Sequence, residues 1–150
     1  MDKTKLNKHF ILASSSKRRL ELLSQIGIKP DLILSPNIDE NIFYKEQPRI
    51  YVERMSLEKN LIFQKRYPDS IILTADTVVS VGRKILPKTM DINTAEKCLK
   101  LISGRRHKVF TSFTVYSPNN SLKTKTIQSI IKFKRLHPDE ISYYLSLIHI

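Results

Sequence analysis

The chain has 150 residues, 41% of them hydrophobic, which is enough for one domain with a buried core. Its 26 Lys and Arg outnumber 14 Asp and Glu, so the formal net charge is +12 and favours a polyanionic partner. A single cysteine, Cys98, excludes an intrachain disulfide and a cysteine-based zinc cluster. No apolar run has the length of a membrane span, and the polar start 1–7 is unlike a signal peptide. We therefore expect a cytoplasmic protein with no membrane partner.

Apolar runs and helical spacings alternate along the first half of the chain. Gly27 stands where a left-handed C-cap would end the first helix, and Pro48 opens the second. The expected elements are a strand over 9–13, a helix over 16–26, a strand over 31–35, an irregular loop over 36–47, and a helix from 48 that ends before 68. One face of the second helix is expected to carry Val52, Met55 and Ile62.

The second half is richer in strands. Gly82 marks a turn, Asn93 with Glu96 resembles a capping box, and Pro138 opens the last helix. The expected elements are a buried strand over 71–75, a β-branched run over 77–81, a short strand over 85–86, a helix over 93–102, long β segments over 107–117 and 122–136, and a helix from 138.

A serine- and arginine-rich turn links the first strand to the first helix. Ser14 and Ser16 precede Arg18 and Arg19 at the helix N-terminus, where free backbone N–H groups and the helix dipole favour an anion. Two guanidinium groups oppose that dipole, and a bound phosphate would remove the conflict. The alternative is that Ser16 is an ordinary N-cap and that the arginines are solvated surface charges.

Asp76 follows an apolar strand directly, at what we take to be the end of that strand. A carboxylate next to a buried strand is costly unless it has a partner, which indicates a metal ligand or a base that activates water. The alternative is an Asp that caps a turn. Glu40 with Asp39, Lys59 and Lys88 could complete a site for a metal–triphosphate complex, although each is also explained as a surface charge.

Taken together, these segments resemble the Maf family of septum-formation-inhibitor-like nucleotide pyrophosphatases. The resemblance covers nearly the whole chain and rests on motifs that occur in the family's order: Leu12-Ala13-Ser14-Ser15-Ser16-Lys17-Arg18-Arg19, Asp39-Glu40, Tyr51-Val52-Glu53-Arg54, Glu58-Lys59, Ala75-Asp76-Thr77-Val78-Val79, and Lys88. Lys17 and Thr89 stand where the family usually has proline, but neither change removes a charge.

The resemblance implies an α/β fold like that of inosine triphosphate pyrophosphatases: a mixed twisted sheet flanked by helices, with two lobes and a central cleft. It implies hydrolysis of dTTP- or UTP-type triphosphates between the α and β phosphates, with Mg²⁺ or Mn²⁺ as cofactor. Asp76 would accept the proton, and Glu40 and Asp76 would bind the metal. The residues implied to bind the substrate are Ser14, Ser16, Arg18, Arg19, Lys59, Thr77 and Lys88.

The resemblance stops near Tyr144, short of a glycine-rich segment, a final strand and a final helix that follow in the family. We therefore expect residues 1–150 to form one Maf-like domain, truncated at its C-terminus. An inactive remnant that at most binds nucleotide is the second hypothesis. A small basic nucleic-acid-binding module is the third, ranked last because no such motif occurs and aromatic residues do not alternate with the basic ones. No stable nucleic-acid partner is expected, and a homodimer is left open.

Overall fold

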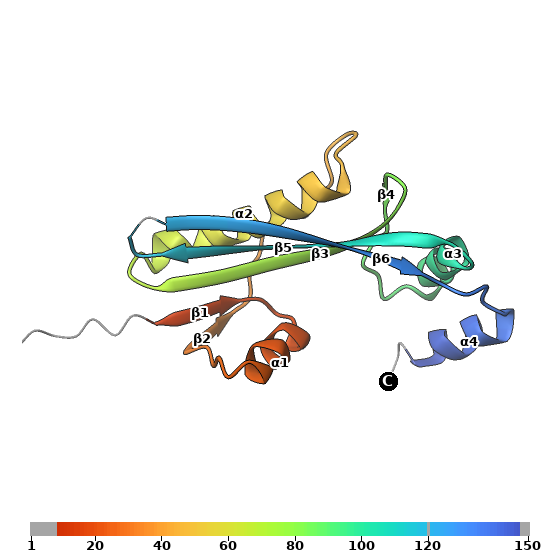
Figure 1. The fold of residues 1–150 in the computed structure, drawn as a ribbon, viewed down its shortest axis with the longest axis horizontal. Coiled ribbons are helices and arrows are strands. Elements are labelled where there is room, and N and C mark those ends of the chain that lie inside the picture. The colour runs from red at the N-terminus through yellow and green to blue at the C-terminus, as the bar shows by residue number, and fades with distance from the viewer. Residues whose placement is uncertain (1–8, 120, 148–150) are drawn as a thin grey trace, which may run out of the picture.

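The computed structural model describes residues 9–119 and 121–147, which form one mixed sheet and four helices (Figure 1). The strands are β1 (Phe10–Ala13), β2 (Leu32–Leu34), β3 (Ile71–Val81), β4 (Lys84–Ile85), β5 (Arg106–Ser117) and β6 (Ser121–Lys132). The helices are α1 (Lys17–Gln25), α2 (Pro48–Arg66), α3 (Ile92–Ile102) and α4 (Pro138–Leu147). Within these residues, no helix is both long and apolar enough to cross a membrane.

The sheet has the order β2-β1-β3-β5-β6, and β4 pairs with β3. β1 runs parallel to both of its neighbours, while β3, β5 and β6 pair in antiparallel fashion. The long strands pass through the middle of the molecule; α1, β1 and β2 lie at one end and α3 and α4 at the other (Figure 1). The expected mixed sheet flanked by helices is confirmed.

The first two connections of the sheet run in opposite directions across β1. From β1 the chain passes through α1 to β2, and from β2 it passes through α2 to β3 on the other side of β1. Leu12 faces α1, whereas Ile11 and Ala13 pack with Phe63 of α2. The carboxyl end of such a strand is where open α/β sheets form a ligand crevice, because the two connecting segments diverge there.

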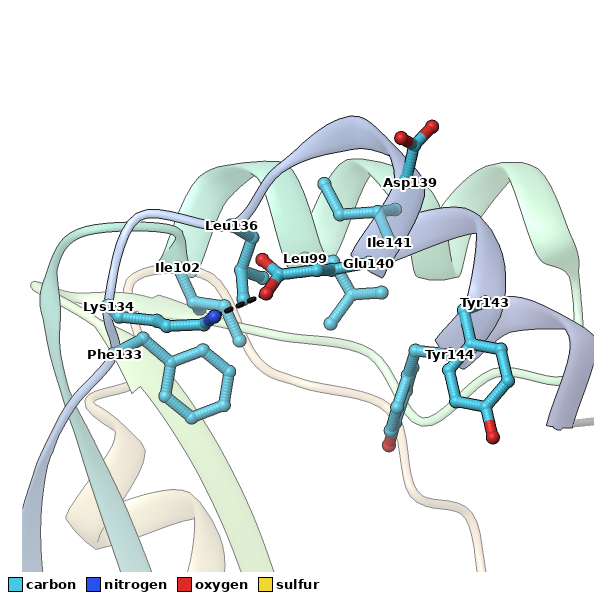
Figure 2. Close-up of a pocket in the computed structure, with 10 residues that line it drawn as sticks. All are labelled: Leu99, Ile102, Phe133, Lys134, Leu136, Asp139, Glu140, Ile141, Tyr143 and Tyr144. Carbon is cyan, nitrogen blue, oxygen red and sulfur yellow. Dashed lines mark hydrogen bonds and ion pairs between the residues drawn. The ribbon is translucent and has the colours of Figure 1, made fainter.

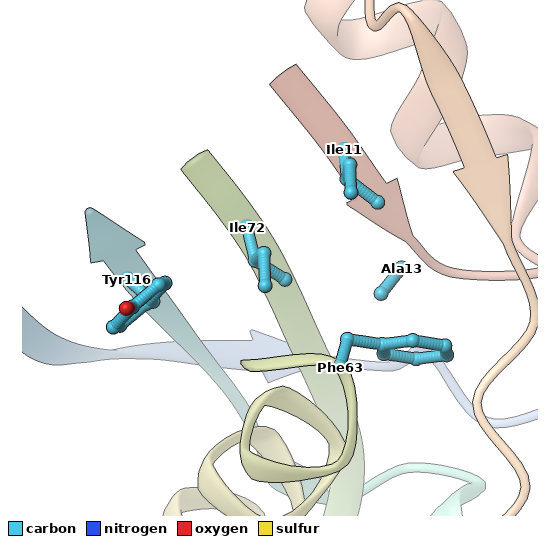
Figure 3. Close-up of a cluster of buried hydrophobic side chains, with 5 residues drawn as sticks. All are labelled: Ile11, Ala13, Phe63, Ile72 and Tyr116. Atoms are coloured by element: carbon cyan, nitrogen blue, oxygen red, sulfur yellow. The ribbon is translucent and has the colours of Figure 1, made fainter. Parts of the chain in front are cut away.

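Helix α2 lies along one face of the sheet and closes two apolar clusters. Phe63, near its C-terminal end, packs in the cluster of Ile11, Ala13, Ile72 and Tyr116 (Figure 3). The N-terminal half of the helix contributes to a second cluster, formed by Tyr51, Val52, Met55, Val78 and Phe110. Burial of these side chains is the main force that holds α2 on the sheet.

Between the two clusters, the buried face of α2 is polar. Ser56, Lys59 and Asn60 are all at most 6% exposed, although a hydrophobic pattern would leave them outside the core. Ile62, predicted to lie on the buried face, is 36% exposed, and Phe63 packs there instead. The prediction is thus confirmed for Val52 and Met55 and wrong for Ile62. The three polar side chains are buried because groups of β3 and β5 provide partners that an apolar pattern does not reveal.

The most connected of these polar side chains is Asn60. Its Nδ2, which carries two hydrogens, has three acceptors within reach: the Ile72 carbonyl oxygen at 3.0 Å, Thr74 Oγ1 at 3.1 Å and the Thr114 carbonyl oxygen at 3.0 Å. We expect Asn60→Ala to lower the free energy of unfolding by about 2 kcal/mol, because buried acceptors lose their donor. Urea denaturation would measure this loss. Gln128→Ala, which removes an exposed amide on β6, should change the free energy by less than about 0.5 kcal/mol, and an equal loss in both variants would contradict the expectation.

Most expected boundaries are shifted by a residue, and three larger differences concern β3, β6 and α3. Asp76 lies inside β3 and not at the end of a strand, because β5 pairs with β3 continuously from Ile72 to Ser80. β6 ends at Lys132, four residues before the expected end at 136. Helix α3 begins after Asp91, whose side chain accepts a hydrogen bond from the Thr94 N–H at 2.8 Å and so acts as the N-cap expected at Asn93.

Candidate active site

The centre of the site is the carboxylate of Asp76, which is 1% exposed. Because side chains alternate along a strand, Asp76 points to the α2 face of the sheet together with Thr74 and Val78. Its Oδ1 accepts hydrogen bonds from Lys59 Nζ and Lys88 Nζ, both at 3.0 Å. Its Oδ2 is buried without a partner among the described residues. A buried carboxylate oxygen left free in this way is costly unless a ligand uses it.

Lys59 joins Asp76 to a second carboxylate. Its Nζ lies 2.7 Å from Glu40 Oε1 as well as 3.0 Å from Asp76 Oδ1. Lys59 comes from the polar centre of α2 and Glu40 from the loop between β2 and α2, where its side chain is half exposed. The two acidic residues predicted to share one site therefore do so, with a single ammonium group between them.

Arg19 and Ser14 lie at the carboxyl end of β1. Arg19 Nη1 donates to Ser14 Oγ at 3.0 Å, and its Nη2 donates to Thr77 Oγ1 at 3.4 Å. Burial lowers the pKa of the Arg19 guanidinium, against the opposing effect of the Asp76 and Glu40 carboxylates. A partly buried cation with two neutral partners is suited to binding an added anion such as a phosphate.

Ser14, Arg19, Glu40 and Lys59 line a pocket of about 190 Å³ at the place where β1 ends, and Asp76 lies behind Lys59 without lining the pocket itself. β1 pairs with β3 only as far as Thr74, and β4 joins the same side of β3 at Ser80. We call the stretch of the β3 edge between them the notch; over residues 75–78 it has no paired strand on this side among the described residues. The pocket is lined by Ala13, Ser14, Ser15, Arg19, Pro36, Asn37, Ile38, Glu40, Lys59 and Ala75. A second pocket of about 230 Å³ shares Glu40 and is lined also by Tyr51 and Lys88.

The other predicted substrate-binding residues lie outside the first pocket. Arg18 is exposed on α1, because successive helical residues point about 100° apart and Arg19 takes the inward direction. Ser16 is the N-cap residue of α1 but its side chain makes no capping hydrogen bond. Thr77 points away from Asp76, and its Oγ1 lies 3.0 Å from Thr111 Oγ1. Roles of Arg18, Ser16 and Thr77 in binding substrate stay predictions.

A larger pocket lies between α3 and α4 but has the wrong chemistry for phosphates. It has a volume of about 590 Å³ and is formed mainly by apolar and aromatic side chains, including Phe133, Tyr143 and Tyr144 (Figure 2). Its one lysine, Lys134, is paired with Glu140. Size alone therefore does not locate the site, whereas the grouping of cations around buried Asp76 does.

Two residues that sequence reasoning did not assign to the site hold the Glu40 loop. Tyr51 Oη donates to the Glu40 carbonyl oxygen at 2.7 Å. Burial, together with the charges of Asp76 and Glu40, raises the pKa of Tyr51 to about 12, so its hydroxyl remains a donor at neutral pH. Arg54 binds Glu46 and the Asn41 carbonyl oxygen. Both belong to the motif quoted for the family, but their partners lie in an irregular loop that no periodic pattern describes.

The contact between Arg54 and Glu46 should make stability depend on pH. The Arg54 hydrogen bond holds the pKa of Glu46 below its ordinary value of 4.5. The charged form therefore stabilises the folded chain above that value, and this contribution is lost as the pH falls through the lower folded pKa. We expect the free energy of unfolding, measured in urea, to decline between about pH 5 and pH 3. Glu46→Gln should decline less steeply, and equal slopes would contradict this.

The donor set suits a divalent cation that is shared with a phosphate-bearing ligand. Among residues 9–119 and 121–147, no group of three or more His, Cys, Asp or Glu side chains could enclose a metal. Mg²⁺ is commonly bound by one or two carboxylates, with substrate phosphates and water as the remaining ligands. Asp76, with its unpartnered Oδ2, and Glu40, half exposed beside it, provide such a pair.

The fold and this site define a member of the Maf-like proteins. The family model described as "Maf-like protein" matches residues 9–148, and the chain belongs to that family. A protein of Ehrlichia chaffeensis named nucleoside triphosphate pyrophosphatase is 47% identical over 137 residues, which are 91% of this chain and 71% of the relative. A Wolbachia protein from the Drosophila simulans strain wRi, named dTTP/UTP pyrophosphatase, is 48% identical over 139 residues, 92% of this chain and 70% of that protein.

The solved structures agree on the fold. The Staphylococcus aureus Ham1 protein is similar with a TM-score of 0.59 at 14% sequence identity. The match covers 83% of this chain and 71% of that one. At such low identity the likeness concerns the α/β architecture alone, and the predicted fold class is confirmed.

Proposed function

We propose that the protein hydrolyses nucleoside triphosphates of the dTTP and UTP type to the monophosphate and pyrophosphate. The names of the Ehrlichia and Wolbachia relatives support the reaction and the nucleotide class. The observation on which the proposal depends is the buried Asp76, with one oxygen held by two lysines and the other without a partner in the described part of the chain. Because nucleoside triphosphates are the substrate, we place the reaction in the cytoplasm.

In this proposal the cationic residues bind the phosphates and the acidic residue Asp76 accepts the proton. Arg19 and Ser14 bind phosphate oxygens at the carboxyl end of β1, and Lys59 and Lys88 neutralise the charge that develops as the bond between the α and β phosphates breaks. Asp76 accepts a proton from the attacking water as the water oxygen bonds to phosphorus and the bridging oxygen leaves with pyrophosphate.

Asp76 and Glu40 would hold the divalent cation. When bound, Mg²⁺ or Mn²⁺ supplies positive charge that polarises the phosphate oxygens and orients the triphosphate. Lys59, between the two carboxylates, keeps them close together without mutual repulsion before the cation arrives. The residues present therefore fit the metal on charge and on donor type.

A pyrophosphate-release assay tests the function directly. The purified chain is incubated with dTTP, UTP, dGTP or ATP in Mg²⁺ or Mn²⁺, and the release of pyrophosphate and of monophosphate is followed. We expect one pyrophosphate per monophosphate, turnover that requires the metal, and faster turnover of dTTP and UTP than of the purine nucleotides. Release of single phosphates, or turnover that is indifferent to chelation, would contradict the proposal.

A thermal-shift measurement separates binding from catalysis. A ligand that binds only the folded protein raises the melting temperature, and the rise grows with the logarithm of the ligand concentration above its Kd. We expect dTTP with Mg²⁺ to raise it. A chain stabilised by dTTP that releases no pyrophosphate would support the inactive nucleotide-binding remnant instead.

A further inference from the structure

The loop that carries Glu40 is held by one arginine of α2. Arg54 Nε donates to Glu46 Oε1 at 2.7 Å, and its Nη2 donates to Glu46 Oε2 at 2.9 Å and to the Asn41 carbonyl oxygen at 2.8 Å. A single guanidinium thus closes the segment from Asn41 to Glu46, which begins directly after Glu40. Forked contacts of this kind fix geometry, because two parallel N–H groups must meet one carboxylate.

Two further contacts belong to this arrangement, which we call the Arg54 clasp (Asn41, Phe43, Glu46 and Arg54); Arg54 Nη1 also lies 3.4 Å from Glu58 of the same helix. The Arg54 guanidinium carbon lies 3.8 Å from the centre of the Phe43 ring, and Glu46 Oε2 accepts a hydrogen bond from the Phe43 N–H at 2.9 Å. The Glu46 side chain is only 5% exposed and that of Arg54 17%, so solvent screens this ion pair little. The clasp is therefore stronger than an ordinary surface ion pair.

Apolar burial holds this loop only before Glu40, where Ile38 packs against the cluster of Tyr51, Val52 and Met55. Ile42, Phe43 and Tyr44 are 49%, 60% and 90% exposed. The loop between residues 35 and 43 contains no helix or strand. After Ile38, the conformation of the loop thus depends on polar contacts with α2: the clasp, the Tyr51 hydrogen bond to the Glu40 carbonyl oxygen and the Lys59 contact with the Glu40 carboxylate.

Three residues of one helix therefore converge on Glu40. Lys59 pairs with its carboxylate, Tyr51 binds its carbonyl oxygen, and Arg54 holds the residue that follows it. Lys59 acts at the site itself, whereas Arg54 acts only through the loop. Loss of Arg54 would leave the Glu40 side chain intact but give its backbone more conformations, which must be given up when a ligand binds.

We propose that Arg54 is a positioning residue: it holds the Glu40 loop so that the carboxylate stays beside Asp76 in a geometry ready for a divalent cation. The inference rests on the proposed function, since it assigns Glu40 to the metal–triphosphate complex. Groups that orient a metal-binding residue commonly change metal affinity ten-fold or more when they are removed. Arg54 acts in the same way, although its hydrogen bonds reach Glu40 through the neighbouring backbone.

The test uses Arg54→Met, Glu46→Gln and the double variant. Arg49→Met is the matched control: it removes one positive charge from the same helix, where Arg49 makes an exposed contact of 3.6 Å with Glu53. Hydrogen exchange of the peptide over residues 37–47 reports on the loop, and Mn²⁺ binding followed by electron paramagnetic resonance reports on the site. Neither measurement requires turnover.

We expect Arg54→Met and Glu46→Gln each to speed exchange in this peptide and to weaken Mn²⁺ binding about ten-fold. The double variant should lose no more than Arg54→Met alone, because both changes break the same contact. Arg49→Met should match the unmutated protein in both measurements. If Arg54→Met does not fold, Glu46→Gln carries the test, since it removes the charge of the contact and keeps the size of the side chain.

Unchanged loop exchange in the clasp variants would overturn the proposal. Faster exchange with unchanged Mn²⁺ affinity would also overturn it, because the clasp would then be structural only. Equal losses in Arg49→Met would assign the effect to the net charge of α2 and reject the clasp. An unmutated protein that binds Mn²⁺ yet releases no pyrophosphate would instead contradict the proposed function alone.

Discussion

Asp76→Asn should lower the rate of pyrophosphate release about a thousand-fold while the protein stays folded. Asparagine has nearly the same shape but cannot accept a proton, so the attacking water loses its base. The fold should tolerate the change, because Lys59 keeps Glu40 as a partner and Lys88, 64% exposed, returns to water. Turnover of dTTP with Mg²⁺ measures the loss, and a denaturant melt verifies the fold.

The control for this change is Asp69→Asn, which makes the same chemical substitution at an exposed position just before β3. It should turn over dTTP at the rate of the unmutated protein. A rate for Asp76→Asn within a few-fold of that control would remove Asp76 as the proton acceptor and leave it a structural partner of the two lysines.

Lys59→Met should damage both stability and turnover. Removing one partner of a buried ion pair leaves an uncompensated charge, and we expect a loss of about 3 kcal/mol, at the lower end of the usual range because Lys88 still contacts Asp76. Turnover should fall about a hundred-fold, since a cation next to the transferring phosphate is lost. Urea denaturation and dTTP turnover measure the two effects.

The lysine variant also allows a metal test. Without Lys59, the carboxylates of Glu40 and Asp76 have no ammonium group between them, so Mn²⁺ should raise the melting temperature more than it does in the unmutated protein. Lys65→Met, an exposed change on the same helix, is the control and should respond to Mn²⁺ as the unmutated protein does. An identical response in all three proteins would argue against a shared cation at these two carboxylates.

Local sequence signals were sufficient for the scaffold and for the main acidic residues. The apolar run of β1, the serines after it and the spacing of α1 placed Ser14 at a strand-to-helix turn, and the structure has it there. Asp76 stood out because a charge beside an apolar run needs a partner, and Lys59 and Lys88 are those partners. Such signals are local in the chain, which is why they can be interpreted without a structure.

The features that were missed depend on contacts between distant segments. Arg18 and Arg19 are chemically alike, and only the packing of α1 against the sheet determines which one enters the pocket. Likewise, Asn60 is buried because Ile72 and Thr114 offer acceptors 12 and 54 residues away. A periodic pattern describes one helix at a time and contains no information about the residues of other segments that this helix contacts in the fold.

The notch between β1 and β4 has a consequence for how substrate choice can change. Over residues 75–78 the described part of the chain places no strand on that side of β3, so the main-chain N–H and C=O groups on this edge have no partner strand. A triphosphate that enters could be gripped there by peptide N–H groups, and no amino-acid replacement except proline deletes such a donor. Binding of the triphosphate by the main chain would therefore be retained when the sequence changes. Preference for one nucleotide base over another would have to come from side chains around the site.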